Sequence, residues 1–292
     1  MPVLDCTPMG KTVVRTVRIF ALVVFLLAPL ITELSARAQG QPGPVVIGER
    51  VQMHSNVLND SRSLMISKPP GYDDGADRYP VLYLLDAETH FQYASGIVNF
   101  LGDNDRMPKM LVVGIDSGDV ARRTRDLTTP STAEIDNRFS PGGGGADGFV
   151  SFIADELIPY VEKNYRTRPY RLLVGHSFGG LFAVYALITR PRLFNAFIAA
   201  DPSLDWNNQA VVAQAESFFS NVKELQMDLY VTAAAGSHTR FLRCSVERPA
   251  CPRSWLPIIA NSARVERAPL TAGRGPLDGL VTSRPGGQGS FR

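Results

Sequence analysis

One segment of the chain combines an apolar strand, a serine flanked by glycines and an apolar helix. Residues 171–185 read RLLVGHSFGGLFAVY, so that Gly175 and Gly179 enclose Ser177 in a Gly-x-Ser-x-Gly pattern. Glycines remove side chains where a chain turns sharply and where a helix crowds a strand. A serine on such a strained turn has its hydroxyl raised above the sheet. The segment therefore predicts a strand–turn–helix unit with Ser177 as the candidate nucleophile.

Strand and helix patterns alternate over the part of the chain that surrounds this turn. Short apolar runs predict strands, and longer amphipathic stretches between them predict helices. The strands are expected at residues 79–85, 110–115, 194–200 and 225–232, and the helices at 91–101, 149–165 and 209–222. Two opening antiparallel strands are expected at residues 45–57 and 63–67. Such alternation predicts a mostly parallel sheet, with reactive groups beyond the carboxyl ends of its strands.

The overall composition excludes several classes of partner. The formal net charge is +2 at pH 7, which gives no electrostatic reason to expect a nucleic acid or an anionic surface as partner. The four histidines show no ligand spacing and are not grouped with the cysteines, so neither a metal nor a cofactor is expected.

The first 38 residues have the pattern of a secretory signal peptide. Lys11, Arg15 and Arg18 precede an apolar run at residues 19–31, and Ala36-Arg37-Ala38 follows it. The apolar run is shorter than the ~20 residues that span a bilayer, although a single membrane anchor is the alternative. We therefore expect cleavage after residue 38, export to the periplasm or the medium, and no stable membrane span afterwards.

Several further strings occur in the order typical of one family. They are PPGY at 69–72, YPVLYLLD at 79–86, RTRDLT at 123–128, ELIPY at 156–160, GHSFGG at 175–180 and PSLDW at 202–206. With these strings the chain resembles the α/β-hydrolase esterases of the esterase D and siderophore (enterobactin/salmochelin) esterase type. The resemblance implies an α/β-hydrolase fold, with a mostly parallel central sheet flanked by helices. It also implies hydrolysis of small-molecule acyl or lactone esters through an acyl-enzyme.

The resemblance assigns roles to residues around the turn. Ser177 matches the nucleophile, and the backbone N–H groups of Phe178 and Glu88 match the donors that stabilise the oxyanion. The family commonly has glycine where this chain has Ala87, which alters the second donor's turn. The Glu88 carboxylate itself is interpreted as a solvated loop charge.

A run of charges at residues 122–126 is expected in a loop at the same edge of the sheet. The family uses this segment to shape its substrate site, which makes Arg123 and Arg125 candidates for substrate contact. A salt-bridged anchor for the loop is the alternative, and we favour it because surface charge clusters usually contribute little. The glycines at 142–145 predict a mobile loop.

The remaining members of a catalytic triad are hard to find. In this fold class the order along the chain is serine, acid, histidine. His54, His90 and His176 precede Ser177, so only His238 can take the last place, in the loop expected after residues 225–232. Asp201 is the candidate acid, with Asp205 as the alternative. Either aspartate could instead cap the segment that follows it.

The C-terminal part of the chain departs from the family pattern. The family's histidine loop, of the His-Gly-Ser type, does not occur, and residues 243–292 are rich in Pro, Gly, Ser and Arg. We therefore divide the chain into a signal peptide at 1–38, a hydrolase domain at 39–242 and a poorly ordered, atypical tail at 243–292. A shifted reading frame after about residue 236 would explain the tail, and a genuine disordered tail is the alternative.

Two questions stay open at this point. Cys244 and Cys251 could form a disulfide in an oxidising compartment or could be incidental thiols, whereas Cys6 would leave with the signal peptide. The function itself has an alternative, namely a hydrolase-like protein that has lost its base and binds esters without turnover. Acyl transfer to an alcohol would use the same residues as hydrolysis.

Overall fold

The computed structural model describes residues 43–222, 227–235 and 238–245. The predicted signal peptide, Cys251 and most of the predicted tail lie outside these residues. The chain divides into two units, residues 1–46 and 47–292, and all the described strands and helices belong to the second. Within the described ranges, no helix is both long and apolar enough to cross a membrane.

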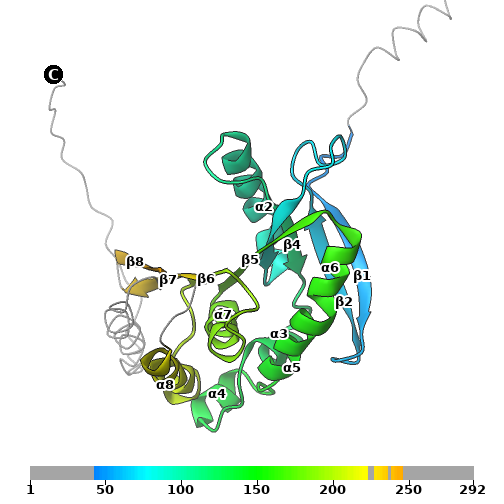
Figure 1. Ribbon diagram of the computed structural model, residues 1–292. Coiled ribbons are helices and arrows are strands. Elements are labelled where there is room, and N and C mark those ends of the chain that lie inside the picture. The colour runs from blue at the N-terminus through cyan, green and yellow to red at the C-terminus, as the bar shows by residue number, and fades with distance from the viewer. Residues whose placement is uncertain (1–42, 223–226, 236–237, 246–292) are drawn as a thin grey trace, which may run out of the picture. The chain divides into compact units, whose positions relative to one another are not determined.

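An eight-stranded sheet forms the centre of the second unit, in the order β1-β2-β4-β3-β5-β6-β7-β8 (Figure 1). The strands are β1 Glu49–Ser55, β2 Asp60–Ser67, β3 Tyr79–Leu84, β4 Leu111–Ile115, β5 Thr167–His176, β6 Ala196–Ala200, β7 Asp228–Ala235 and β8 His238–Ser245. Five neighbouring strands pair in parallel, namely β4, β3, β5, β6 and β7. The strands β1, β2 and β8 pair antiparallel with their neighbours. The predicted mostly parallel sheet with an antiparallel opening is confirmed.

Helices connect the parallel strands. They are α2 Ala87–Asp103, α3 Val120–Leu127, α4 Glu134–Phe139, α5 Ala146–Phe152, α6 Ile158–Asn164, α7 Phe178–Thr189 and α8 Trp206–Asn221. The single helix predicted at 149–165 is instead α5 and α6 joined by a five-residue π-helical turn, Ile153–Leu157. In α8 the residues 207–209 have positive φ, so the regular helix begins after residue 209. This start agrees with the helix predicted at 209–222.

Two predictions about loops were wrong. The charged run at residues 122–126 is helical, because it lies within α3, where the Asp119 side chain caps the helix by accepting the N–H of Arg122 at 2.8 Å. His238 does not lie in a loop after β7 but is the first residue of β8, whose backbone pairs with β7 as far as Ser245. Strand β8 ends at Ser245, three residues after the predicted domain end at 242, and the domain division remains a prediction.

The glycines at 142–145 lie in a turn in which Gly143 and Gly145 are packed, whereas nothing in the described part of the chain lies within 4 Å of a Cβ on Gly142; the mobility of this loop remains a prediction. A Cβ on Gly143 would lie 2.4 Å from Thr128 Oγ1 and 2.7 Å from the Trp206 ring. A Cβ on Gly145 would lie 2.9 Å from the carbonyl oxygen of Arg125. These positions exclude a side chain because neighbouring residues fill the space.

Alternating side chains of the strands pack against helices on both faces of the sheet. Leu173, Phe197 and Leu229 belong to the larger core cluster, together with apolar residues of α5, α6, α7 and α8. Leu82, Leu84 and Val112 point the other way and form a smaller cluster with α2. This two-sided burial is what parallel strands require.

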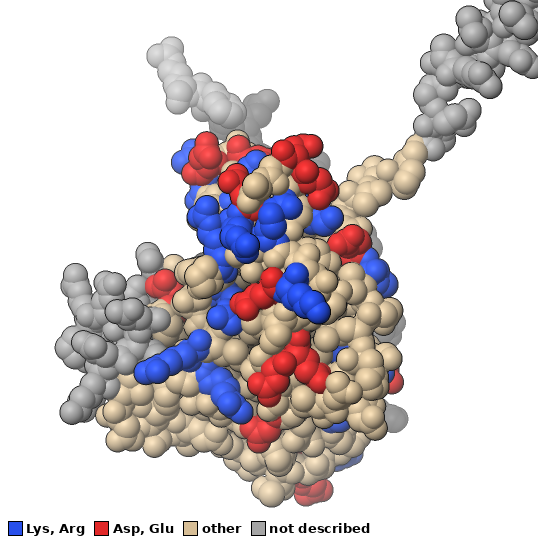
Figure 2. All heavy atoms as spheres, turned by 45° about the vertical axis from the view of Figure 1, so that its right-hand side comes forward, with Lys and Arg blue, Asp and Glu red and all other residues tan. Residues whose placement is uncertain are grey.

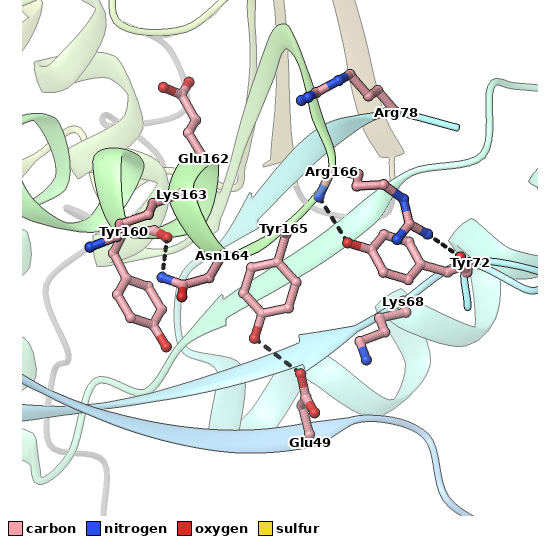
Figure 3. Close-up of a pocket in the computed structure, with 10 residues that line it drawn as sticks. All are labelled: Glu49, Lys68, Tyr72, Arg78, Tyr160, Glu162, Lys163, Asn164, Tyr165 and Arg166. Carbon is pink, nitrogen blue, oxygen red and sulfur yellow. Dashed lines mark hydrogen bonds between the residues drawn. The ribbon is translucent and has the colours of Figure 1, made fainter. Parts of the chain in front are cut away.

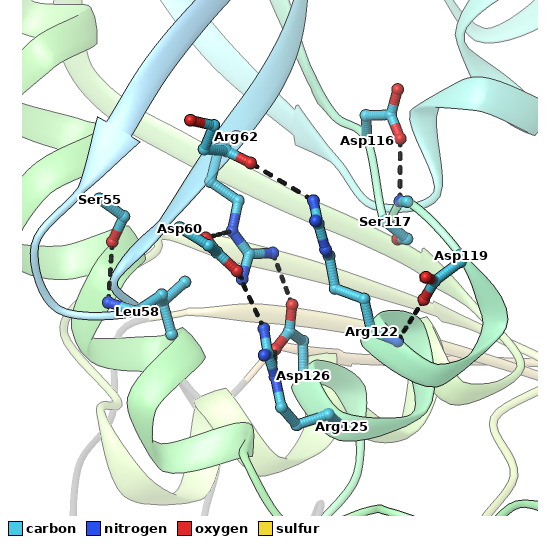
Figure 4. A network of polar contacts seen from close by, with 12 residues as sticks. Ser55, Leu58, Asp60, Arg62, Asp116, Ser117, Asp119, Arg122, Arg125 and Asp126 are labelled. Atoms are coloured by element: carbon cyan, nitrogen blue, oxygen red, sulfur yellow. Dashed lines mark hydrogen bonds and ion pairs between the residues drawn. The ribbon is translucent and has the colours of Figure 1, made fainter.

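A buried arginine links β2 to α3 (Figure 4). The Arg62 side chain is fully buried and forms two hydrogen bonds to the Asp60 carboxylate, at 2.7 and 2.9 Å. A third, at 2.5 Å, reaches Asp126 of α3. The guanidinium carbon lies 5.5 Å from the centre of the Phe149 ring. Because burying ions is costly, the arrangement is stable only while each charge keeps its partners.

We expect Arg62→Met to destabilise the protein by about 3 kcal/mol or more, because it removes three charge-assisted hydrogen bonds and leaves the buried Asp126 carboxylate with Arg125 as its remaining ion-pair partner. Urea unfolding of the purified protein would measure the change. The matched control is Lys109→Met, which removes an exposed ion pair with Asp103 and should cost less than about 1 kcal/mol. Equal losses for the two variants would contradict the structural role given to the buried network.

Candidate active site

Ser177 lies between the carboxyl end of β5 and the start of α7, in a strained backbone conformation. Its φ and ψ are 57° and −117°, a region that residues other than glycine rarely occupy. The Ser177 N–H donates to the carbonyl of Ala200 at 3.0 Å, and its carbonyl accepts the N–H of Leu181 at 2.9 Å. The predicted strand–turn–helix unit is therefore confirmed. Neighbouring backbone holds the strain in place.

The two glycines of the motif allow this turn to close. A Cβ on Gly175 would lie 2.1 Å from the carbonyl oxygen of Gly179, closer than any real contact. A Cβ on Gly179 would lie 3.3 Å from Asp86 Oδ2 and 3.4 Å from the Leu85 Cβ. The start of α7 thus packs directly against the turn that follows β3.

Two helices begin at this edge of the sheet, one after each of two adjacent parallel strands. Leu84 of β3 is paired with Val174 of β5, so that α2 and α7 start next to each other. The first N–H groups of a helix have no partner within the helix and carry partial positive charge. Phe178 and Glu88 are in the first turns of these two helices. Their predicted role as oxyanion donors remains a prediction.

The start of α2 is fixed by a buried carboxylate. Asp86 is 3% exposed and has a left-handed backbone, with φ 53° and ψ 47°. It accepts two hydrogen bonds from the Arg123 guanidinium, at 2.7 and 2.8 Å, and one from the Ser117 hydroxyl at 2.7 Å. The Glu88 carboxylate, expected to be solvated, is exposed but accepts the N–H of Ser117 at 3.0 Å.

Both candidate arginines of the charged run form ion pairs. Arg123 is paired with Asp86, and its guanidinium carbon lies 5.4 Å from the centre of the Phe178 ring. Arg125 reaches Asp126 at 2.8 Å and Asp60 at 3.2 Å. This geometry agrees with the favoured interpretation of the run as a salt-bridged anchor. Direct contact of either arginine with a substrate remains a prediction.

Ser203 is a residue of the site that the sequence did not single out. Its Oγ lies 3.1 Å from Ser177 Oγ, and its N–H donates to the carbonyl of Ser177 at 3.1 Å. It belongs to the turn after β6, within the string PSLDW that supports the family resemblance. The nearby Trp206 ring packs edge-on against Phe178, at 5.3 Å between ring centres.

The candidate base and acid remain predictions. His238 is the first residue of β8, and its backbone pairs with that of Ala235 on β7. Strands β6 and β7 lie between β8 and β5. The His238 side chain is outside the described residues. Asp201 is exposed and directly follows Ala200, whose carbonyl accepts the Ser177 N–H. The Asp201 N–H donates to the carbonyl of Thr232 at 3.0 Å. Asp201 is thus next to the nucleophile turn along the sheet edge.

The two histidines near the turn form a contact of their own. The rings of His90 and His176 are 5.7 Å apart, and Tyr93 Oη lies 2.8 Å from His90 Nδ1. Burial lowers the pKa of His90, so this imidazole is mostly neutral at pH 7. His176 continues the alternation of Leu172 and Val174 toward the α2 face, whereas α7 covers the other face. His176 is exposed at this position, so it is not a buried packing residue.

A polar pocket of about 550 Å³ lies at the amino ends of β3 and β5, whereas Ser177 follows the carboxyl end of β5 (Figure 3). It is lined by residues that immediately precede β3 and β5, among them Arg78, Tyr165 and Arg166. Its groups contact one another: Tyr165 donates to Glu49 at 3.0 Å, and the Arg166 guanidinium lies 3.9 Å from the centre of the Tyr72 ring. This pocket is separated from Ser177 by the length of β5.

Two observations concern charge and metals. On the face shown in Figure 2, acidic and basic side chains are interspersed, as the low net charge suggests. Among the residues whose positions are described, no group of three or more His, Cys, Asp or Glu side chains could hold a metal ion.

Comparison with known proteins places this site in a family. Residues 55–244 match the family model described as "Putative esterase". The chain belongs to this esterase family. The family match begins in β1 and ends in β8, so it covers almost the whole sheet and the turn that carries Ser177.

Individual relatives agree with the family. The chain is 33% identical to the ferri-bacillibactin esterase BesA of Bacillus subtilis, over 65% of this chain and 70% of the relative. It is 41% identical to the siderophore enterobactin esterase of Emericella nidulans, over 34% and 36% of the two chains. The chain thus spans about a third of the second relative's length.

Solved structures show the same fold. An IroE-like serine hydrolase from Shewanella oneidensis superposes with a TM-score of 0.58 at 32% identity, over 63% of this chain and 60% of that one. The siderophore hydrolase EstA from Aspergillus nidulans gives a TM-score of 0.58 at 27% identity, over 66% and 72%. The predicted α/β-hydrolase fold of this esterase-family chain is therefore confirmed.

We expect Gly175→Ala to prevent the turn from closing, because its Cβ would overlap the Gly179 carbonyl at 2.1 Å. Little of the expressed variant should be soluble and unfold cooperatively. Circular dichroism and thermal unfolding would measure this. Gly96→Ala is the matched control, since nothing lies within 4 Å of its Cβ position in α2. This control should be about 0.5–1 kcal/mol more stable than the parent. A normally folded Gly175→Ala variant would contradict the geometry of the turn.

Proposed function

We propose that this chain hydrolyses carboxylic esters of small molecules, including lactone esters of the siderophore type, with Ser177 as nucleophile. The observation that carries the proposal is the strained backbone of Ser177 at the start of α7, held by hydrogen bonds to Ala200 and Leu181. Strain of this kind persists only where the surrounding structure enforces it, and it concentrates at functional sites. Two relatives are named as siderophore esterases, and these names support siderophore-type esters as the substrate class.

The proposed reaction has two steps. Ser177 Oγ attacks the ester carbonyl as a base takes its proton, and the leaving alcohol receives a proton as its bond to the acyl carbon breaks. Water then attacks the acyl-enzyme, which releases the acid and returns the proton to Ser177 Oγ. In each step the charged carbonyl oxygen would be stabilised by the N–H groups of Phe178 and Glu88. The water step distinguishes hydrolysis from acyl transfer to an alcohol.

We assign the base to His238 and its orienting acid to Asp201. Chain order supports this assignment, because His238 is the only histidine after Ser177. Both residues also belong to the edge of the sheet at which β5, β6 and β7 end.

We expect Ser177→Ala to lower kcat for a short-chain p-nitrophenyl ester by about 10³-fold or more. Ser220→Ala removes an exposed hydroxyl that donates to the carbonyl of Glu216 in its own helix, and it should keep full activity. Hydrolysis of enterobactin, followed by chromatography, tests the substrate class with the same variants. Turnover by the parent chain no greater than that of Ser177→Ala would overturn the proposed function.

We expect His238→Ala to lower kcat by a similar factor and to remove the rise of activity with pH near the pKa of an imidazole. His54→Ala is the matched control, because His54 is exposed on β1 at the far side of the sheet. A pH profile of His238→Ala that matches the parent would show that another group is the base.

We also propose that the protein is exported and acts in the periplasm or the medium. The proposal is supported by the basic, apolar and small-residue order of the first 38 residues. Mass spectrometry of the protein recovered from a secreting host should find a mature chain that starts at Gln39. A chain that retains its first 38 residues would contradict export by cleavage.

A further inference from the structure

Ser203 contacts the candidate nucleophile through both its side chain and its backbone. Its Oγ lies 3.1 Å from Ser177 Oγ, and its N–H donates to the carbonyl oxygen of Ser177 at 3.1 Å. The two residues are 26 positions apart in the chain and come from turns after neighbouring parallel strands, β5 and β6. The second hydroxyl is therefore held against the nucleophile by the fold of the sheet edge.

The position of Ser203 is set by groups other than the Ser177 hydroxyl. The N–H of Leu204 donates to the carbonyl of Pro202 at 2.7 Å, which closes a three-residue turn centred on Ser203. Leu204 and Trp206 on its far side are both buried, and Trp206 Nε1 donates to the carbonyl of Thr129 at 2.7 Å. The Ser203 hydroxyl is thus preorganised, a condition under which a hydrogen-bond donor is most effective in catalysis.

We propose that Ser203 is a positioning residue for the attacking oxygen of Ser177. In the resting protein either hydroxyl can donate to the other. When the base removes the Ser177 proton, the Ser177 oxygen can only accept, so the Ser203 O–H donates to it. The Ser203 O–H bond stays intact throughout, and the proton of Ser177 still goes to the base. Hydrogen bonds to charged groups are stronger than those between neutral groups, so the contact favours the attacking state over the resting state.

This inference rests on the proposed function, and its test separates the two. A fluorophosphonate probe forms a bond from Ser177 Oγ to phosphorus as fluoride leaves, so its labelling rate follows the nucleophilic step alone. Ser203→Ala and Ser203→Cys remove the hydroxyl, the second with little change in shape and only a weak S–H donor. Ser203→Thr retains a hydroxyl. Ser220→Ala, on the exposed face of α8, is the control.

We expect the probe to label Ser177 about 10- to 100-fold more slowly in Ser203→Ala and Ser203→Cys than in the parent. The midpoint of thermal unfolding should be the same in all three proteins. In Ser203→Thr the labelling rate of Ser177 should be within about threefold of the parent rate. A change of that size is what a small loss of packing alone produces. A parent rate in Ser203→Cys, or a Ser203→Thr as slow as Ser203→Ala, would overturn the inference. Labelling that is absent from the parent chain, or that persists in Ser177→Ala, would overturn the proposed function and this inference with it.

Discussion

The close approach of Gly175 to Gly179 is the constraint on which the rest of the site depends. It lets α7 start immediately after β5, and it forces Ser177 into a conformation that its neighbours must hold. The carbonyl of Ala200 and the N–H of Ser203, both from the β6 end, do so through backbone hydrogen bonds. The proposed nucleophile is thus raised above the sheet while hydrogen bonds hold its backbone, an arrangement that suits acyl transfer.

A layer of buried charge supports this edge of the sheet. The short helix α3 contributes Arg123 to the buried Asp86 and Asp126 to the buried Arg62. A helix of eight residues is not stable alone, so these ion pairs and its packing hold it in place. Through Asp86 the same charges fix the start of α2, whose first N–H groups we assign to the oxyanion site. The proposed chemistry at Ser177 therefore depends on the ion pairs that hold α3 and Asp86 in place.

The strands and the nucleophile turn were predictable from the sequence because apolar runs and glycine spacing are local signals. The helix α3 was missed because four of its eight residues are charged and only Val120, Ala121 and Leu127 are apolar, which is too few to mark a helix. The π-helical turn within 149–165 comprises only five residues, and the helical pattern of the whole segment did not reveal it. Ser203 was missed because a contact between hydroxyls 26 residues apart depends on strand order alone. The imidazole base and its acid stay predictions for a related reason, since their roles depend on side-chain placement.

The central claim is that Ser177 becomes covalently acylated, and trapping the intermediate tests it most directly. The purified chain would be mixed with a p-nitrophenyl ester, quenched in acid within the first turnover, digested and examined by mass spectrometry. The account predicts an added acyl mass on the peptide that contains Ser177, absent when Ser177→Ala is treated identically. An acyl group on another residue, or product release with no covalent adduct at any quench time, would contradict it.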